Sequence, residues 1–120
     1  ELTEGFTEAY GVAPNGHVAE TYTTAWVIKT AIENAGTDDR NAVRDALEAV
    51  EIVDKFPNGP EIVLPYNKIS FDDVTWQDNH HTNTNSGASV AVGQIQDGKL
   101  VTVWPFEYVE STVNIPAKYE

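Results

Sequence analysis

Residues 92–105 decide much of the fold, and they read VGQIQDGKLVTVWP. The pair Asp97-Gly98 separates two apolar runs and suits a two-residue type I′ turn, because both central residues of that turn need φ > 0. We therefore predict a β-hairpin with strands over 88–96 and 99–104. A two-stranded ribbon alone is only marginally stable in water. The hairpin therefore implies a further sheet or helix on which it lies.

The composition indicates a soluble, acidic protein of about one domain. The 120 residues are 41% hydrophobic and carry 19 Asp and Glu against 7 Lys and Arg, a formal charge of -12. Nucleic acids and anionic membrane surfaces bind a basic face. We therefore expect no nucleic-acid partner and no binding to anionic lipid.

Several residue types are absent from the chain. There is no Cys and no Met, which excludes a disulfide, a thiolate zinc site and a cysteine nucleophile. No apolar run approaches the ~20 residues of a membrane span. Because the chain opens on Glu1 without a Met or a signal peptide, we expect a processed product or a fragment.

Two consecutive segments have the pattern of amphipathic α-helices. Apolar residues of the first, 17–35, recur every three or four positions, as on one face of a helix; they are Val18, Tyr22, Ala25, Ile28, Ile32 and Ala35. Gly36 then suits a left-handed C-cap, and residues 37–39 supply an N-cap for the next helix. That helix runs to about Val50, with an inward face of Val43, Ala46, Leu47 and Val50. The short connection predicts that the two helices pack as neighbours.

The segments on either side of these helices are less regular. Residues 1–10 read as the end of a helix that Gly11 and Pro14-Asn15-Gly16 interrupt. After the PNGP sequence at 57–60, we predict short strands over 61–64 and 68–71.

Two later segments are read as irregular. Residues 72–88 are polar and turn-rich, which predicts a long surface loop. Residues 106–120 read as an extended tail anchored by Ile115-Pro116.

Two fold classes fit this order of elements. Helices followed by antiparallel strands fit a small α+β domain. Helices with a wide apolar stripe and a closing hairpin also fit the last piece of a larger α/β protein whose parallel strands lie elsewhere.

The order and spacing of several sequence words favour the second class. The words are YTTAW at 22–26, AIENAGTDDRNAVRDAL at 31–47, LPY at 64–66, ISFDD at 69–73, QIQDGK at 94–99 and VWP at 103–105. Over residues 6–116 they resemble the C-terminal third of the solute-binding proteins of branched-chain amino acid and amide ABC transporters, which have the type I periplasmic binding fold.

The resemblance implies an α/β protein of two lobes, joined by three crossing segments, with the ligand clamped between the lobes. The chain would supply the helical portion of one lobe (1–56), an inter-lobe crossover (57–73) and the loop, β-hairpin and tail of the other lobe (74–120). Taken alone it would look α+β. The parallel sheets and most ligand contacts would come from the missing N-terminal part of the same protein or from a second chain.

The function implied by the resemblance is that of an extracytoplasmic binding component of an ABC importer for an amino acid, an amide or a related small polar solute. Its partners would be that ligand and the ABC transporter permease. It would be periplasmic or extracellular, either free or held by a lipoprotein anchor, and would need no cofactor. The alternatives are a ligand-sensing domain of a receptor with the same fold, an independent α+β interaction module, and an enzyme such as an amide hydrolase.

The resemblance also implies a ligand contact at the start of the first long helix. In branched-chain amino acid binders a cleft aromatic precedes the helix tyrosine by five positions, and counting back from Tyr22 gives His17. A histidine departs from that apolar pattern and suggests a more polar ligand. We therefore predict His17 as a ligand contact, with Val18 and Glu20 beside it.

The histidines and carboxylates of 72–81 raise the question of a metal site. His80 and His81 lie near Asp72, Asp73 and Asp78, and imidazole and carboxylate suit zinc or nickel. Adjacent histidines point apart in a strand, and the aspartates lack the spacing of an EF-hand. We therefore expect no metal site.

We interpret the remaining candidate residues as structural. Of the tryptophans, Trp26 lies off the helical stripe, which predicts that it faces an element outside this chain, whereas Tyr22 reads as core. No serine has a recognisable base nearby, and no catalytic motif is present. We therefore predict that the chain is not an enzyme.

Overall fold

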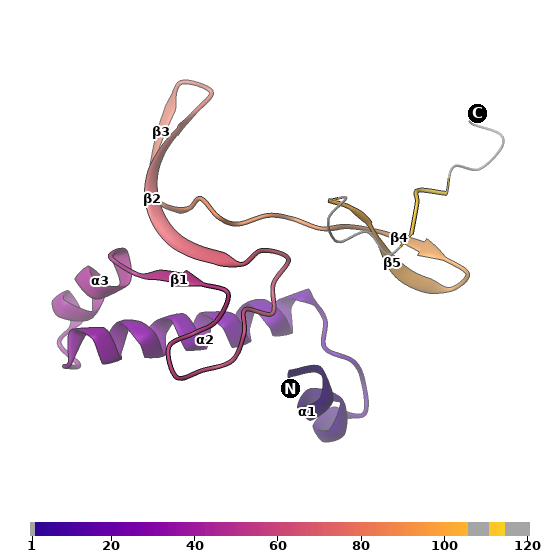
Figure 1. Ribbon diagram of the computed structural model, residues 1–120, viewed down its shortest axis with the longest axis horizontal. Coiled ribbons are helices and arrows are strands. Elements are labelled where there is room, and N and C mark those ends of the chain that lie inside the picture. Colours follow the sequence, from indigo (N-terminus) through magenta and orange to yellow (C-terminus); the bar gives the residue numbers. More distant parts are fainter. Residues whose placement is uncertain (1, 106–110, 115–120) are drawn as a thin grey trace. The chain divides into compact units, whose positions relative to one another are not determined.

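The computed structural model describes residues 2–105 and 111–114 and is a mixed α/β structure (Figure 1). In chain order, the elements are α1 (Leu2–Tyr10), α2 (Gly16–Ala35), α3 (Arg40–Glu48), β1 (Glu51–Val53), β2 (Lys68–Trp76), β3 (Asn79–Asn85), β4 (Val92–Gln96) and β5 (Lys99–Trp104). They fall into two compact units, residues 1–88 and 89–120.

The ends of the helices follow the predicted capping chemistry. Asn15 caps α2, since its side-chain oxygen accepts a 3.1 Å hydrogen bond from the Val18 N–H. Gly36 closes α2 in the left-handed region (φ 65°), as predicted, and its N–H donates to the Ile32 carbonyl. Asp39 is the N-cap of α3 and accepts from two backbone N–H groups. These caps fix the turn that brings α3 back along the end of α2 (Figure 1).

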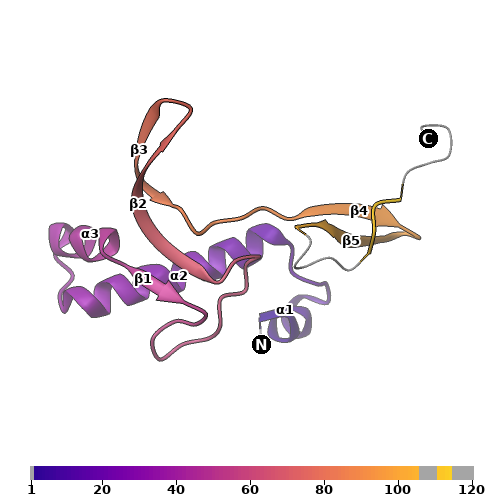
Figure 2. The ribbon, with the colours of Figure 1, turned by 45° about the horizontal axis from the view of Figure 1, so that its top comes forward.

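The core of residues 1–88 lies between α2 and the strands that follow α3. Its buried members are Val27, Ala31, Val50, Ile52, Phe56 and Ile69. In both views β1 and the start of β2 lie alongside α2 (Figures 1 and 2). A Cβ on Gly59 would lie 2.8 Å from atoms of both Phe56 and Trp26. Only glycine therefore allows this loop to close over the core.

The predicted stripe of α2 does not form its buried face. Thr23, Val27, Thr30 and Ala31 are buried, whereas Ile28 and Ile32 remain 46% and 43% exposed. The error arises because α2 has apolar residues on both sides. Two of the inward positions are threonines, which a count of apolar residues passes over. The inward face predicted for α3 is confirmed, with Val43 and Leu47 packed on the core.

Neither aromatic residue of α2 has the role predicted for it. Trp26 packs on the core, with its ring centroid 5.9 Å from that of Phe56. Tyr22 is half-buried, lies outside the core cluster and meets Trp26 edge-on at 6.5 Å. Trp26 therefore has its partner within this chain, contrary to the prediction.

The sheet of this unit has the order β1-β2-β3 and is antiparallel throughout. Strand β1, which pairs with Lys68–Ser70, was not predicted. The predicted strand over 61–64 is wrong, because only Glu61 makes a bridge, with Lys55. Pro60 and Pro65 flank that segment, and proline cannot donate to a sheet ladder.

The predicted surface loop over 72–88 is also wrong, because β2 continues to Trp76 and β3 returns to Asn85. The two strands are joined at Gln77 and Asp78, which have φ of 48° and 62°. From Asp72 onward β2 is largely exposed, and so is β3, whereas the start of β2 is buried at Ile69 and Ser70. Without a buried face, the ribbon needs no apolar alternation, so its sequence looks like a loop.

The predicted hairpin is confirmed in residues 89–120. Strands β4 and β5 pair antiparallel and turn at Asp97 and Gly98, with φ of 50° and 76°. The Gln94 side chain donates to the Asn114 carbonyl (2.8 Å) and accepts from the Asn114 N–H (2.7 Å). Most of the predicted tail, with Ile115-Pro116, lies outside the described residues. Among the described residues, none of the helices has both the length and the apolar character needed to cross a membrane.

Candidate functional site

The first turn of α2 presents two of the three predicted ligand contacts together. His17 Nδ1 lies 3.1 Å from Glu20 Oε2, and the two side chains are 92% and 63% exposed. Val18 is half-buried, and its N–H is engaged by the Asn15 cap. The start of α2 therefore offers an imidazole and a carboxylate side by side at the surface.

A groove of about 470 Å³ opens beside this helix start. It is lined by Glu20, Thr23, Thr24, Val27, Ile28, Leu47, Leu64, Tyr66, Ile69, Phe71 and Asn85. These residues come from α2, α3, the segment before β2, and the strands β2 and β3. Glu20 is one of the lining residues, whereas His17 and Val18 are not.

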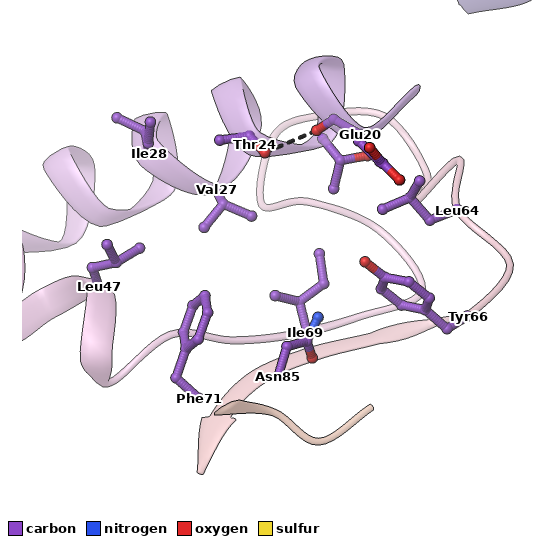
Figure 3. A pocket seen from close by; sticks show the side chains of 11 residues that line it. Glu20, Thr24, Val27, Ile28, Leu47, Leu64, Tyr66, Ile69, Phe71 and Asn85 are labelled. Atoms are coloured by element: carbon purple, nitrogen blue, oxygen red, sulfur yellow. Dashed lines mark hydrogen bonds between the residues drawn. The ribbon is translucent and has the colours of Figure 1, made fainter. Parts of the chain in front are cut away.

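The two ends of the groove differ in chemistry. Figure 3 shows Glu20 and Tyr66 at one end and Leu47 and Phe71 at the other. Burial raises the pKa of the Tyr66 hydroxyl above its usual range, and the negative charge of Glu20 adds to that rise. The neutral phenol can donate a hydrogen bond at this end, while the opposite end is lined by the apolar side chains of Leu47 and Phe71.

One residue that lines the groove, Thr23, has a buried hydroxyl without a partner among the described residues. Thr23 is 4% exposed, and its Oγ1 makes no hydrogen bond within the described residues. A buried hydroxyl without a partner is unfavourable by roughly 1–3 kcal/mol. Among the described residues, the Thr23 hydroxyl is the buried side-chain polar atom for which no hydrogen-bond partner is seen.

The carboxylates and histidines near residues 72–81 are spread along the β2–β3 ribbon. His80 Nε2 lies 3.8 Å from Asp73 Oδ2. Asp72 accepts hydrogen bonds from Ser86 and Ser70, and these bonds lower the pKa of its carboxyl group. Within the described ranges, no group of three or more His, Asp or Glu side chains is arranged to hold a metal ion.

Sequence reasoning missed most of the groove. Its apolar lining from Leu64, Tyr66, Ile69 and Phe71 depends on how the segment before β2 folds over α2. The missing partner of Thr23 is likewise a property of tertiary structure. A sequence signal did exist in the several threonines of α2, since a threonine on a buried helix face must find a hydrogen-bond partner.

Comparisons with known proteins point to one family. A family model described as periplasmic binding protein matches residues 1–99. The Leu/Ile/Val-binding protein homolog 7 of Brucella suis biovar 1 (strain 1330) is 33% identical over 117 residues, which are 97% of this chain and 26% of that protein. Proteins of the same name from Brucella melitensis biotype 1 and Brucella abortus (strain 2308) are 33% and 32% identical over the same shares.

The chain thus spans about a quarter of the length of these curated relatives. No solved structure matches the chain significantly.

Proposed function

The chain belongs to the periplasmic binding protein family, and from this premise we propose that it is part of an extracytoplasmic protein that binds a small polar solute for an ABC importer. The match of the family model over residues 1–99 carries the proposal. The family is one of binding proteins, and the proposed role includes no catalytic step. The proposed location is periplasmic or extracellular, with or without a lipid anchor.

The proposed ligand is an amino acid, an amide or a related solute with a polar group. The relatives are named as Leu/Ile/Val-binding protein homologs. The side chains of those three amino acids are aliphatic and apolar. The exposed pair of His17 and Glu20 supports a ligand that also carries hydrogen-bonding groups, because an imidazole and a carboxylate within 3.1 Å offer both a donor and an acceptor. Val18 beside them would supply an apolar contact.

The proposed mechanism is clamping between two lobes. Residues 1–56 would belong to one lobe, 57–73 to the crossover and 74–120 to the other lobe. A ligand held between the lobes stabilises the closed form, and it shifts the hinge equilibrium only by its greater affinity for the closed form than for the open form. The permease of the importer would be the partner of that closed form.

A thermal-shift screen tests the proposal. It uses a polypeptide that contains this chain and has the length of the relatives. The compounds are amino acids, urea and short amides, and a bound ligand raises the melting temperature by mass action. The His17→Ala variant should bind the same ligand about tenfold more weakly, a loss of about 1.4 kcal/mol. His81→Ala is the matched control, because His81 is exposed on β3 and should leave affinity unchanged.

Two results would count against the proposal. A screen in which no compound raises the melting temperature removes the solute-binding role. Equal affinities of wild type and His17→Ala remove His17 from the binding site while leaving that role in place.

A further inference from the structure

The triplet Pro-Asn-Gly occurs twice in the chain, at 14–16 and at 57–59, and it contains both Asn-Gly pairs of the sequence. In such a pair the backbone nitrogen of glycine can attack the side-chain carbonyl carbon of asparagine, because glycine has no Cβ to obstruct the approach. The new N–C bond closes a five-membered succinimide ring, and the side-chain NH2 leaves with the glycine proton as ammonia. One water molecule then opens the ring to aspartate or isoaspartate.

The fold protects the second pair. The Gly59 N–H donates a 3.0 Å hydrogen bond to the Phe56 carbonyl, so the attacking nitrogen is engaged. A Cβ on Gly59 would lie 2.8 Å from atoms of Phe56 and Trp26, and Phe56 is 1% exposed. Turning this peptide toward the Asn58 side chain would therefore disturb the closed loop and the core beneath it.

The first pair lies in open space at the start of α2. Asn15 and Gly16 are exposed, and a Cβ on Gly16 would meet no other part of the chain within 4 Å. The Gly16 N–H stands at the first helical position, where no preceding turn accepts from it, and it makes no hydrogen bond in the part of the chain that the structure describes. The end of a helix also opens at little cost in free energy. The attacking nitrogen is therefore free to approach the Asn15 side chain.

The cap of α2 adds an electrostatic contribution. The Val18 N–H donates a 3.1 Å hydrogen bond to Asn15 Oδ1. Attack on the side-chain carbon turns this oxygen into an oxyanion, and a donor already directed at it stabilises the negative charge as it develops. The positive end of the helix acts in the same direction. The hydrogen bond that caps α2 therefore also favours attack on the capping side chain.

We propose that Asn15 is a site of spontaneous deamidation, in which the Gly16 nitrogen is the nucleophile and the Val18 N–H stabilises the oxyanion. Asn58 stands in the same triplet and is protected by the contacts of Gly59. The fold thus decides which of two identical triplets is modified.

The two products differ in their effect on α2. Aspartate keeps an acceptor for the Val18 N–H and is a favourable N-cap. Isoaspartate lengthens the backbone by one methylene, so the cap is lost and the turn that carries His17 and Glu20 is displaced. This last consequence for ligand contacts rests on the proposed function, whereas the reaction itself does not.

Peptide mass mapping of the ageing chain tests the proposal. The chain is kept folded in mildly alkaline buffer and digested with trypsin at intervals, and cleavage at Lys29 and Lys55 puts the two triplets in different peptides. In the folded chain, Asn15 should deamidate at least about tenfold faster than Asn58. In guanidinium chloride the two rates should agree within about threefold, because the contacts that distinguish the triplets are gone.

Two results would overturn the proposal. One is a rate at Asn15 no greater than the rate at Asn58 in the folded chain. The other is the same ratio of rates in the folded and the denatured chain, which would assign the difference to the residues that follow the triplets, His17 and Pro60.

The variant Gly16→Ala tests the nucleophile. Alanine fits the open space at this position, and its Cβ should slow deamidation at Asn15 while the rate at Asn58 stays unchanged. Equal rates at Asn15 in wild type and in Gly16→Ala contradict the role of the Gly16 nitrogen.

The variant Asn15→Ser serves as the control for the site. Serine retains a capping oxygen and removes the reacting amide, so an isoaspartyl-specific methyltransferase should label the aged variant far less than aged wild type. Equal labelling of the two places the reaction elsewhere and overturns the proposal.

The outcome is separable from that of the proposed function, because the mass measurements involve no ligand. A thermal-shift screen without a hit removes the solute-binding role and leaves the measured rates at Asn15 and Asn58 as they are. A hit together with equal rates at the two asparagines keeps solute binding and overturns the deamidation proposal.

Discussion

The two sides of α2 carry similar side chains and have different surroundings. On the covered side, Val27 and Ala31 are 7% and 0% exposed against Phe56, whereas on the exposed side Ile28 and Ile32 are nearly half exposed. Of the six residues that the helical period marks, Ala25, Ile28 and Ile32 are exposed, and the other three are half-buried. Periodicity therefore shows that a helix face is apolar, and it does not show which element covers that face.

Truncating the largest fully buried side chain should reveal the greatest difference in stability between the covered side of α2 and its exposed side. Phe56 is 1% exposed and stacks against Trp26, so Phe56→Ala should lower the free energy of unfolding of the 120-residue chain by about 3–5 kcal/mol. Ile32→Ala on the exposed side is the control, and it should stay within about 0.5 kcal/mol of wild type. Urea denaturation followed by tryptophan fluorescence measures both.

Comparable losses from the two variants would show that Ile32 is packed in this chain as well. The distinction between a covered and an uncovered side of α2 would then fail.

The sequence predicted the parts of the fold that depend on local chemistry. Gly36 was predicted as a C-cap, residues 37–39 as the source of an N-cap, and Asp97-Gly98 as a turn, because each provides the conformation or the acceptor that its position needs. The fold class and the family resemblance are also confirmed. The contacts proposed for His17, Val18 and Glu20 stay predictions.

The parts that failed depend on partners distant in sequence. The β2–β3 ribbon turns at Gln77 and Asp78, which adopt φ > 0 without the glycine that marks the other hairpin. Trp26 was assigned to a partner elsewhere because nothing in the sequence shows that Phe56 folds back onto it. The groove could not be predicted for the same reason, since its walls come from segments that meet only in the tertiary structure.

The turn after α2 provides a second test, because it decides which side of α2 receives α3. Gly36 has φ 65° and open space around its Cα, so Gly36→Ala should cost about 1–2 kcal/mol through backbone conformation alone. Gly36→Asn should cost less, since asparagine tolerates the left-handed region. Thermal unfolding by circular dichroism measures the difference. Equal stability of Gly36→Ala and wild type would show that the turn does not need this conformation.

The two buried threonines of α2 sharpen the comparison further. In the 120-residue chain, Thr23→Val removes a buried hydroxyl that has no described partner, and should raise the free energy of unfolding by about 1 kcal/mol. Thr30→Val removes a hydroxyl bonded to the Trp26 carbonyl, and should leave stability unchanged or slightly lower. A loss of stability in Thr23→Val would mean that its hydroxyl is already satisfied in this chain.

The smallest expected effect lies at the end of the groove where Glu20 and Tyr66 stand. Burial raises the pKa of Tyr66, and the charge of Glu20 raises it further. Glu20→Gln should therefore lower the pKa of Tyr66 without returning it to its usual value, since burial, the larger cause, remains. Tyrosinate absorbance, taken as the difference from the same titration of a Tyr66→Phe variant, isolates this group among the 5 tyrosines.

The sign of the pH effect follows from the direction of this shift. The unfolded chain loses the Tyr66 proton first, near pH ~10, so the contribution of the neutral phenol to stability is complete below that pH and is lost as the pH rises through the folded-state pKa. Glu33→Gln is the control, because it changes an exposed carboxylate of α2 that pairs with Lys29 outside the groove. If Glu33→Gln lowers the pKa of Tyr66 as much as Glu20→Gln does, the effect reflects the net charge of the helix, and Glu20 has no specific place beside the phenol.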